Sequence, residues 1–286
     1  MISYNKLFNI DVEKCVVPIY LEIENHIVAV GSGFFISPGL LMTAAHIFSQ
    51  MPIEELMRNK HGFREIKNLR YFFPFRIDDS NVIFRNILHI YRCDSHDISI
   101  CLTDPPFYNN QQFNENCFGL SFDVAPEGSH ILSLGYPNFN ANKINYNSFN
   151  LNHTLHESTG FITNIYKDRR DRGMLNFPCF EFNTKILAGM SGGPILSLDS
   201  KKVIGVNCSS YPEDPELPSI SFGSSLWPVL SFHIQTYTKQ SPQHRVSVWE
   251  MCNTNFLNSD SSYKKFVLDL NLETLKTEIK ENNNIN

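Results

Sequence analysis

The sequence has no long hydrophobic run and no excess of positive charge. No stretch approaches the roughly 18 consecutive apolar residues that a membrane-spanning helix requires, and residues 1–14 lack the apolar core of a secretory signal peptide. The 24 lysines and arginines are outnumbered by 29 aspartates and glutamates, which gives a formal net charge of −5. We therefore expect neither a membrane nor a nucleic acid among the partners of this protein.

Paired cysteines are absent as well. The seven cysteines are odd in number and scattered, without a Cys-x-x-Cys pair, and this pattern argues against a disulfide framework and against a zinc site. Free thiols are typical of a reducing compartment, so we expect a cytoplasmic location. We expect no metal ion and no other cofactor.

The chain is long and hydrophobic enough to fold without disulfides. With 286 residues, 42% of them hydrophobic, it can bury one large all-β domain or two fused barrels. Short apolar runs such as 15–23 and 98–102 are bounded by turn residues and predict strands. A polar connection with a double proline at 103–113 predicts a boundary. The predicted segments are an N-terminal barrel at 1–110, a C-terminal barrel at 111–238 and an extension at 239–286.

The extension carries a regular apolar pattern. Leu268, Leu272, Leu275 and Ile279 are spaced by four, three and four residues, which predicts one apolar face of a helix. This stripe either packs on the parent domain or binds a regulatory protein partner.

The central motif of the sequence is a glycine-rich turn around Ser191. A serine hydroxyl becomes a nucleophile only when a base takes its proton and nearby donors stabilise the oxyanion. Gly189 has no Cβ, so its N–H and that of Ser191 can converge on one point. We expect Gly192 and Gly193 to let a substrate backbone come close. The alternative is a tight glycine turn between strands without chemistry.

A histidine and an aspartate precede this serine in positions that suit a catalytic triad. His46 ends an apolar strand, and Asp97 opens the alternating run 98–102, where a carboxylate can be held against an imidazole. Asp94 and Asp104 are rivals of Asp97, but Asp94 lies outside the alternating run and Asp104 belongs to a Thr-Asp-Pro-Pro turn. We therefore expect Asp97 to be the partner of His46.

These motifs together resemble those of the trypsin-like serine peptidases. In that family a Gly-x-Gly-Phe strand, here at 31–34, leads into a Thr-Ala-Ala-His motif, here ending at His46, and the nucleophile lies in a Gly-x-Ser-Gly-Gly-Pro turn. The Leu-Gly-Tyr-Pro strand at 134–137 is similar to that of HtrA-like bacterial members. The resemblance covers about residues 15–237 in patches, and the extension is too short for a PDZ-like module.

The resemblance implies a fold and a set of roles. The fold is all-β, a chymotrypsin-like pair of six-stranded antiparallel barrels with a short helical C-terminal extension. His46 is the general base, Asp97 fixes its tautomer and Ser191 attacks the peptide carbonyl. The amides of Gly189 and Ser191 form the oxyanion hole.

The sequence departs from the family at three positions. Met190 replaces an aspartate that pairs with a newly cleaved amino terminus, so activation by such a terminus is not expected. Cys208 stands where many relatives have a serine that hydrogen-bonds the triad aspartate, and a thiol is a weaker donor. Lys185 stands at the floor of the primary specificity pocket; pointing inward it favours an acidic or polar side chain, and turned outward it leaves an apolar pocket. The segment implied to bind substrate contains Cys208, Ser209 and Ser210.

We expect a cytoplasmic serine endopeptidase that acts on a protein or peptide substrate in regulation, defence or quality control. Two other readings stay open. One is a catalytically silent double barrel that binds peptides along the strand 203–210. The other is a protease effector that a partner controls through the extension.

Overall fold

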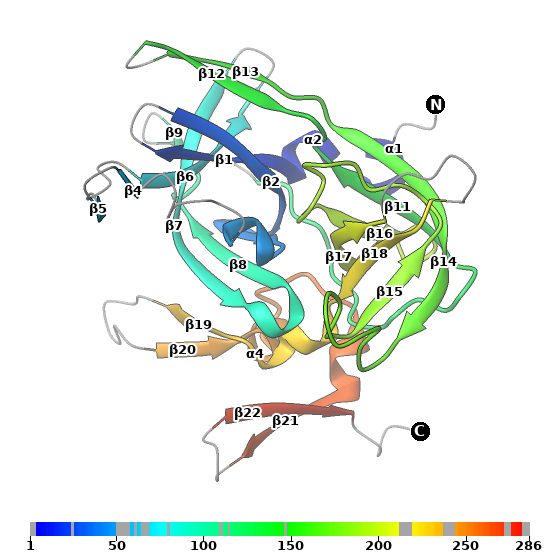
Figure 1. Ribbon diagram of the computed structural model, residues 1–286. Coiled ribbons are helices and arrows are strands. Elements are labelled where there is room, and N and C mark those ends of the chain that lie inside the picture. The colour runs from blue at the N-terminus through cyan, green and yellow to red at the C-terminus, as the bar shows by residue number, and fades with distance from the viewer. Residues whose placement is uncertain are drawn as a thin grey trace.

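The computed structural model describes residues 4–23, 26–49, 58–59, 62–63, 69–78, 81–108, 111–113, 115–145, 148–211, 219–236, 244–271 and 276–281. Two closed six-stranded antiparallel β-barrels form most of the structure (Figure 1), as the sequence predicts. Within these residues no helix has both the length and the apolar character needed to span a bilayer.

The first barrel has the strand order β1-β2-β3-β8-β7-β6. Every residue of β1 and β3 is buried, in agreement with their apolar sequences. Its strands are β1 (Val16–Ile23), β2 (His26–Ser37), β3 (Leu40–Thr43), β6 (Leu69–Arg76), β7 (Val82–Cys93) and β8 (Ile98–Thr103). The 3-10 helices η1 (His46–Phe48) and η2 (Asp94–His96) follow β3 and β7, so they lie at the ends of strands that carry candidate site residues.

The second barrel has the strand order β11-β14-β15-β18-β17-β16. A separate apolar cluster fills it, built around Phe180, Phe182 and Met190. Its strands are β11 (His130–Gly135), β14 (His156–Tyr166), β15 (Cys179–Phe182), β16 (Pro194–Ser197), β17 (Val203–Ser210) and β18 (Ser221–Ser225). The glycine-rich turn at residues 189–193, here called the nucleophile turn after the role that the sequence predicts for Ser191, lies directly before β16.

Smaller elements surround the barrels. Two short helices precede β1, and among the described residues five two-stranded hairpins lie outside the barrels, four of them before the last hairpin of the extension. They are α1 (Tyr4–Phe8), α2 (Val12–Cys15), β4 (Arg58–Asn59) with β5 (Gly62–Phe63), β9 (Phe107–Tyr108) with β10 (Gln111–Gln112), β12 (Asn140–Asn145) with β13 (Ser148–Asn152), and β19 (His233–Thr236) with β20 (His244–Ser247). The 3-10 helix η3 (Trp227–Ser231) follows β18, and its Val229 and Leu230 pack in the main hydrophobic core.

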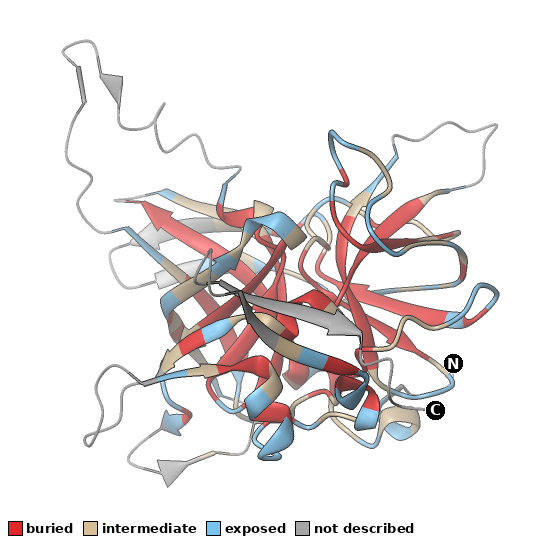
Figure 2. Ribbon diagram, turned by 90° about the horizontal axis from the view of Figure 1, so that it is seen from below, coloured by how far each residue is buried: buried red, intermediate tan, exposed pale blue. Residues whose placement is uncertain are grey.

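The main hydrophobic core is continuous from the first barrel to the extension. It contains Tyr20 of β1, Leu134 of β11 and Met251 of the extension, all buried. Figure 2 shows the buried residues concentrated on the barrel strands. The barrels and the extension are therefore held by one shared core.

The predicted helical stripe in the extension is wrong. Residues there form a hairpin of β21 (Phe266–Asn271) and β22 (Lys276–Glu281), with Leu268 opposite Ile279; Leu272 and Leu275 lie outside the described residues. A spacing of four is shared by a helix and by two repeats of a strand, so the spacings 268 to 272 and 275 to 279 do not discriminate. The single spacing of three falls between the two strands.

The extension does contain short helices elsewhere. They are α4 (Val248–Asn253) and the 3-10 helix η4 (Ser261–Lys265). Helix α4 begins with a capping box, in which Ser247 and Glu250 satisfy one another's backbone N–H groups. The extension also pairs with the connection between the barrels, because Leu120 donates to the carbonyl of Asn258 at 2.8 Å and accepts from the N–H of Asp260 at 3.0 Å.

Candidate active site

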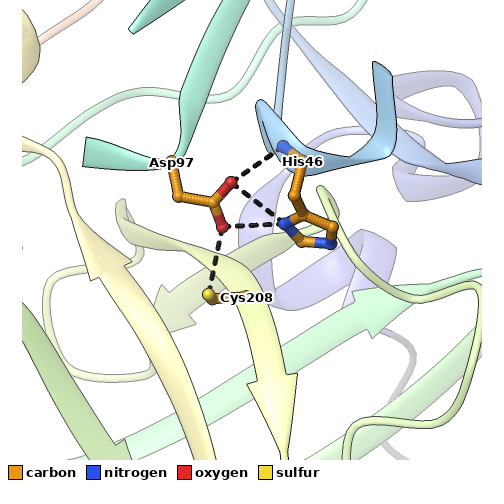
Figure 3. A group of neighbouring side chains, drawn as sticks. All are labelled: His46, Asp97 and Cys208. Carbon is orange, nitrogen blue, oxygen red and sulfur yellow. Dashed lines mark hydrogen bonds and ion pairs between the residues drawn. The ribbon is translucent and has the colours of Figure 1, made fainter. Parts of the chain in front are cut away.

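His46 and Asp97 meet at the edge of the first barrel (Figure 3). The ring Nδ1 of His46 lies 2.8 Å from Oδ2 and 3.0 Å from Oδ1 of Asp97, and the backbone N–H of His46 donates to Oδ1 at 2.9 Å. A carboxylate only accepts hydrogen bonds, so Nδ1 carries the proton and Nε2 is left as an acceptor. The imidazole therefore has the tautomer that a general base needs.

The backbone around Asp97 holds its carboxylate in this position. Asp97 caps η2 with a left-handed φ of 52°, a conformation that aspartate tolerates better than most residues. Its N–H donates to the carbonyl of Asp94, and its own carbonyl accepts from Ala45, the residue before His46. The side chain is buried. The turn between β7 and β8 thus aims Asp97 at the start of η1.

Cys208 of the second barrel supports the same carboxylate. Its Sγ donates to Oδ2 of Asp97 at 3.0 Å, from a buried position on β17. Burial, and after it the negative charge of Asp97, raise the pKa of the Cys208 thiol well above its usual range. The group is therefore a neutral thiol that can donate its proton to Asp97.

Ser191 lies on the other side of Cys208. Its Oγ donates to the backbone carbonyl of Cys208 at 3.3 Å, so a single residue of β17 contacts both Asp97 and Ser191. Among the described contacts the hydroxyl bonds this carbonyl and not the imidazole. Hydrogen bonds in a substrate-free site are often long or differently aimed, and rotation about the Cα–Cβ bond redirects the Ser191 hydroxyl.

Ser32 of β2 ties the nucleophile turn to the first barrel. Its N–H donates to the carbonyl of Ser191 at 2.8 Å, and its Oγ donates to the carbonyl of Gly189 at 2.8 Å. The same Oγ accepts from the N–H of Tyr136 at 2.9 Å. Ser32 is fully buried. The sequence analysis missed this role, although a small polar residue between two glycines at the end of an apolar strand was a visible signal.

Asn207 of β17 holds the turn from within the second barrel. Its Nδ2 donates to the carbonyl of Leu134 at 2.9 Å and to that of Met190 at 3.2 Å, while its Oδ1 accepts from Ser133 at 2.8 Å. Its backbone carbonyl accepts from the N–H of Gly192 at 2.8 Å. This residue was also missed; the signal was a polar residue directly after the apolar run 203–206.

Gly192 and Gly193 do not make room for a substrate, and that prediction is wrong. Gly192 has a φ of 87°, and a Cβ there would overlap Thr43 Oγ1 and the carbonyl of Ser32 in the first barrel. A Cβ at Gly193 would overlap the carbonyl of Leu134. The two glycines instead allow the turn to pack between the barrels.

Two backbone N–H groups at the turn are available to a ligand. Gly189 has a φ of 97°, and a Cβ there would lie 2.5 Å from the carbonyl oxygen of Tyr136. The carbonyl of Ala188 accepts from Asn138 at 3.1 Å, and in a trans peptide the N–H of Gly189 then points the opposite way. In the part of the chain described, the N–H groups of Gly189 and Ser191 donate to no protein atom.

The residues expected to bind substrate border this site. Ser210 Oγ donates to the carbonyl of Ile186 at 2.9 Å, and Ser221 Oγ accepts from the N–H of Ile186 at 3.0 Å. The segment that begins at Lys185 therefore packs against the end of β17 and the start of β18, where these two residues pair. Lys185 is partly buried, and its carbonyl accepts from Ser158. The pairing of β17 with β16 ends at Val206. Beyond it, Ser209 and Ser210 pair with β18 on one side only, among the described strands.

Known structures share this fold at low sequence identity. Deg5 is 18% identical, with a TM-score of 0.50 over 78% of this chain and 88% of that chain. The HtrA-type protease AlgW, solved with a decapeptide, is 14% identical, with a TM-score of 0.51 over 78% of this chain and 63% of that chain. The active form of the Rv3671c protease from M. tuberculosis is 17% identical, with a TM-score of 0.48 over 74% and 76%.

Sequence comparison identifies the family. No protein of curated function matches the chain. The family model described as the trypsin-like peptidase domain matches residues 31–206, which include His46, Asp97 and Ser191. The chain belongs to the trypsin-like peptidase family.

Proposed function

We propose that this protein is a serine endopeptidase that hydrolyses peptide bonds through an acyl-enzyme, with His46, Asp97 and Ser191 as its catalytic triad. The observation that carries the proposal is the His46 imidazole held by Asp97 in the tautomer of a general base. Cys208 connects Ser191 to this pair, because its thiol donates to the carboxylate and its backbone carbonyl accepts from the Ser191 hydroxyl. Such an arrangement of groups from distant segments suits acyl transfer.

The proposed reaction begins with the transfer of the Ser191 proton to Nε2 of His46 as Oγ attacks the peptide carbonyl. Asp97 stabilises the imidazolium that forms. The free N–H groups of Gly189 and Ser191 donate to the carbonyl oxygen as it becomes an oxyanion. His46 then gives the proton to the leaving amine, and a water molecule, activated by the same imidazole, hydrolyses the ester on Ser191.

The proposed substrate is an extended peptide that adds to the open side of β17. Backbone groups of Cys208, Ser209 and Ser210 then pair with the peptide as an additional strand, and side-chain pockets supply the preference. Lys185, next to this edge, is the residue proposed to line the primary pocket.

The proposed enzyme needs no cleavage to create a new amino terminus. Met190 is fully buried in the apolar cluster of the second barrel. Its side chain carries no carboxylate, so it cannot form an ion pair with a new amino terminus. The bond from Asn138 to the carbonyl of Ala188 already turns the Gly189 N–H away from that carbonyl. Both features support an oxyanion hole that is formed before substrate binds.

We also propose that the protein works in the cytoplasm. All seven cysteines are free thiols, several of them in the core. Such thiols persist in a reducing compartment.

A fluorophosphonate probe tests the proposed function, because it reacts with an activated serine. Wild-type protein should be labelled and should cleave an unstructured protein substrate, and Ser191→Ala should do neither. Ser200→Ala, on an exposed turn after β16, is the control and should be labelled like the wild type. Unlabelled wild-type protein that binds peptides tightly would overturn the proposal in favour of a silent binding module.

A further inference from the structure

Three side chains with different metal-binding atoms meet behind the proposed base. The Nδ1 of His46, a carboxylate oxygen of Asp97 and the Sγ of Cys208 all lie within 4.8 Å of one another. In the described part of the chain this is the one group of three or more histidine, cysteine and acidic side chains gathered this closely. His46 lies on η1, Asp97 directly before β8 and Cys208 on β17. Because these elements are far apart in the sequence, no short sequence motif indicates the cluster.

We propose that His46, Asp97 and Cys208 form a zinc-binding site, and that zinc there switches the peptidase off. The second half of this inference rests on the proposed function; the first half does not. Imidazole nitrogen, carboxylate oxygen and thiolate sulfur are the three ligand types that Zn²⁺ takes in proteins. Three protein ligands leave one coordination position for water.

Charge favours zinc over other ions at this place. Zn²⁺ with one thiolate and one carboxylate makes a set of zero net charge, and a neutral set suits a site where Asp97 and Cys208 are buried. Mg²⁺ and Ca²⁺ prefer oxygen ligands, of which the cluster offers only the carboxylate. The site should therefore bind Zn²⁺ and Co²⁺ and ignore Mg²⁺.

The geometry requires a small rearrangement. Asp97 Oδ2 lies 2.8 Å from His46 Nδ1 and 3.0 Å from Cys208 Sγ. Around a tetrahedral zinc, with bonds of about 2.0 Å to nitrogen or oxygen and 2.3 Å to sulfur, such atoms lie about 3.3–3.5 Å apart. Both distances must widen by about 0.5 Å, so Cys208 and Asp97 separate slightly as well. The His46 side chain is 24% exposed and Asp97 only 9%, so the imidazole has the most room to move and the ion enters on its side.

The positions of the protons on His46 and Cys208 explain how zinc would inhibit the proposed peptidase. The two hydrogen bonds that now converge on Asp97 place one proton on Nδ1 and one on sulfur. When zinc binds, the thiol proton leaves to solvent, and the imidazole proton moves from Nδ1 to Nε2, so that Nδ1 binds the metal and the imidazole stays neutral. Nε2 can then no longer accept the proton of Ser191. One proton is released per ion, no covalent bond of the protein is broken, and a chelator reverses the change.

Cobalt titration of the chelator-treated full chain tests the site directly. A thiolate ligand gives Co²⁺ a charge-transfer band in the near ultraviolet, which should saturate at one equivalent and disappear when Zn²⁺ is added. Cys208→Ser should lose the band and bind Zn²⁺ about tenfold or more weakly. Cys93→Ser is the matched control, since Cys93 is a half-buried thiol near Asp94 and His96, and it should keep the band.

A second measurement separates the two halves of the inference. Fluorophosphonate labelling of metal-free protein should fall at least tenfold with one equivalent of Zn²⁺ and return with chelator. Absence of the band, or its persistence in Cys208→Ser, would overturn the site. A cobalt band in protein that the probe never labels would leave the site standing and reject the proposed peptidase. Zinc binding with unchanged labelling would overturn the switch alone.

Discussion

Ser32 of the first barrel donates its N–H to the carbonyl of Ser191 in the second barrel at 2.8 Å. The proposed nucleophile is thereby fixed to the barrel that carries its base. The Oγ of Ser32 adds bonds to Gly189 and Tyr136. Together with Asn207 and Cys208, this buried residue sets the position of the hydroxyl relative to the first barrel.

Ser32→Ala should therefore lower activity strongly, although the substitution removes only one oxygen atom. The backbone bond to Ser191 remains, but the carbonyl of Gly189 and the N–H of Tyr136 lose their partner, and a buried polar group without a partner costs about 1–3 kcal/mol. We expect kcat/KM to fall about 10- to 100-fold, measured on a fluorogenic peptide. Ser37→Ala, a buried serine on the same strand that contacts Phe256, should leave kcat/KM near the wild-type value.

The effect of a Cys208 substitution on kcat should depend on whether the new side chain can still donate a hydrogen bond to Asp97. Cys208→Ser keeps a donor, and a hydroxyl is stronger than a thiol, so it should retain or raise kcat. Cys208→Ala leaves Oδ2 without that bond, which is worth about 1.5–3 kcal/mol to a charged group, and kcat should fall about tenfold or more. Equal kcat values for the two variants would show that the thiol contributes nothing to catalysis.

Asp97→Asn should remove most of the activity without unfolding the protein. An amide can donate to Nδ1 and so stabilise the tautomer in which Nε2 carries the proton, and the expected loss of kcat is about 10⁴-fold. Thermal unfolding of the variant should stay cooperative. Asp94→Asn is the control, because Asp94 lies on the same turn with a side chain that is 67% exposed. Comparable losses in both variants would assign the effect to the turn and not to the carboxylate.

Alanine substitutions at Gly39 and Gly192, which both have positive φ, should distinguish the cost of backbone strain from the cost of steric overlap. Gly39→Ala places a Cβ where no atom lies within 4 Å, so it should cost only the backbone term of about 1–2 kcal/mol. Gly192→Ala adds overlaps with Thr43 and Ser32, worth about 1–3 kcal/mol more. Urea unfolding should rank Gly192→Ala as the less stable variant, and its labelling by the fluorophosphonate probe should be lost. Equal free energies of unfolding would contradict the packing role.

Truncations should distinguish the two halves of the extension. A chain that ends at Leu268 keeps α4, η4 and the stacking of Phe266 on Trp227, and it should fold. A chain that ends at Ser247 loses buried apolar side chains, each worth roughly 1.5–3 kcal/mol, a total comparable to the 5–15 kcal/mol of a whole domain. We expect it to be insoluble or unfolded by circular dichroism. The lost side chains include Val248, Met251, Cys252, Leu257, Tyr263 and Phe266.

The sequence predicts best where local chemistry and local structure coincide. The apolar runs predict strands, and the family resemblance implies the two barrels. The residues around His46 and Ser191 occur in short motifs whose small neighbours are needed for packing. Asp97 follows from the alternation of β8. Ser32 and Asn207 could not be identified in the same way, because their roles depend on hydrogen bonds to segments distant in the sequence: Ser32 and Gly189 are 157 residues apart, and Asn207 and Leu134 are 73 apart. The extension was misread for a different reason, since its spacings suit either periodicity.

The backbone pairing of Leu120 with Asn258 and Asp260 has a consequence for biosynthesis. Leu120 lies in the connection between the barrels, and its partners leave the ribosome only after both barrels have been made. During translation these two backbone hydrogen bonds of Leu120 therefore form only after both barrels have left the ribosome. The proposed peptidase should therefore complete its fold only after the extension has been translated.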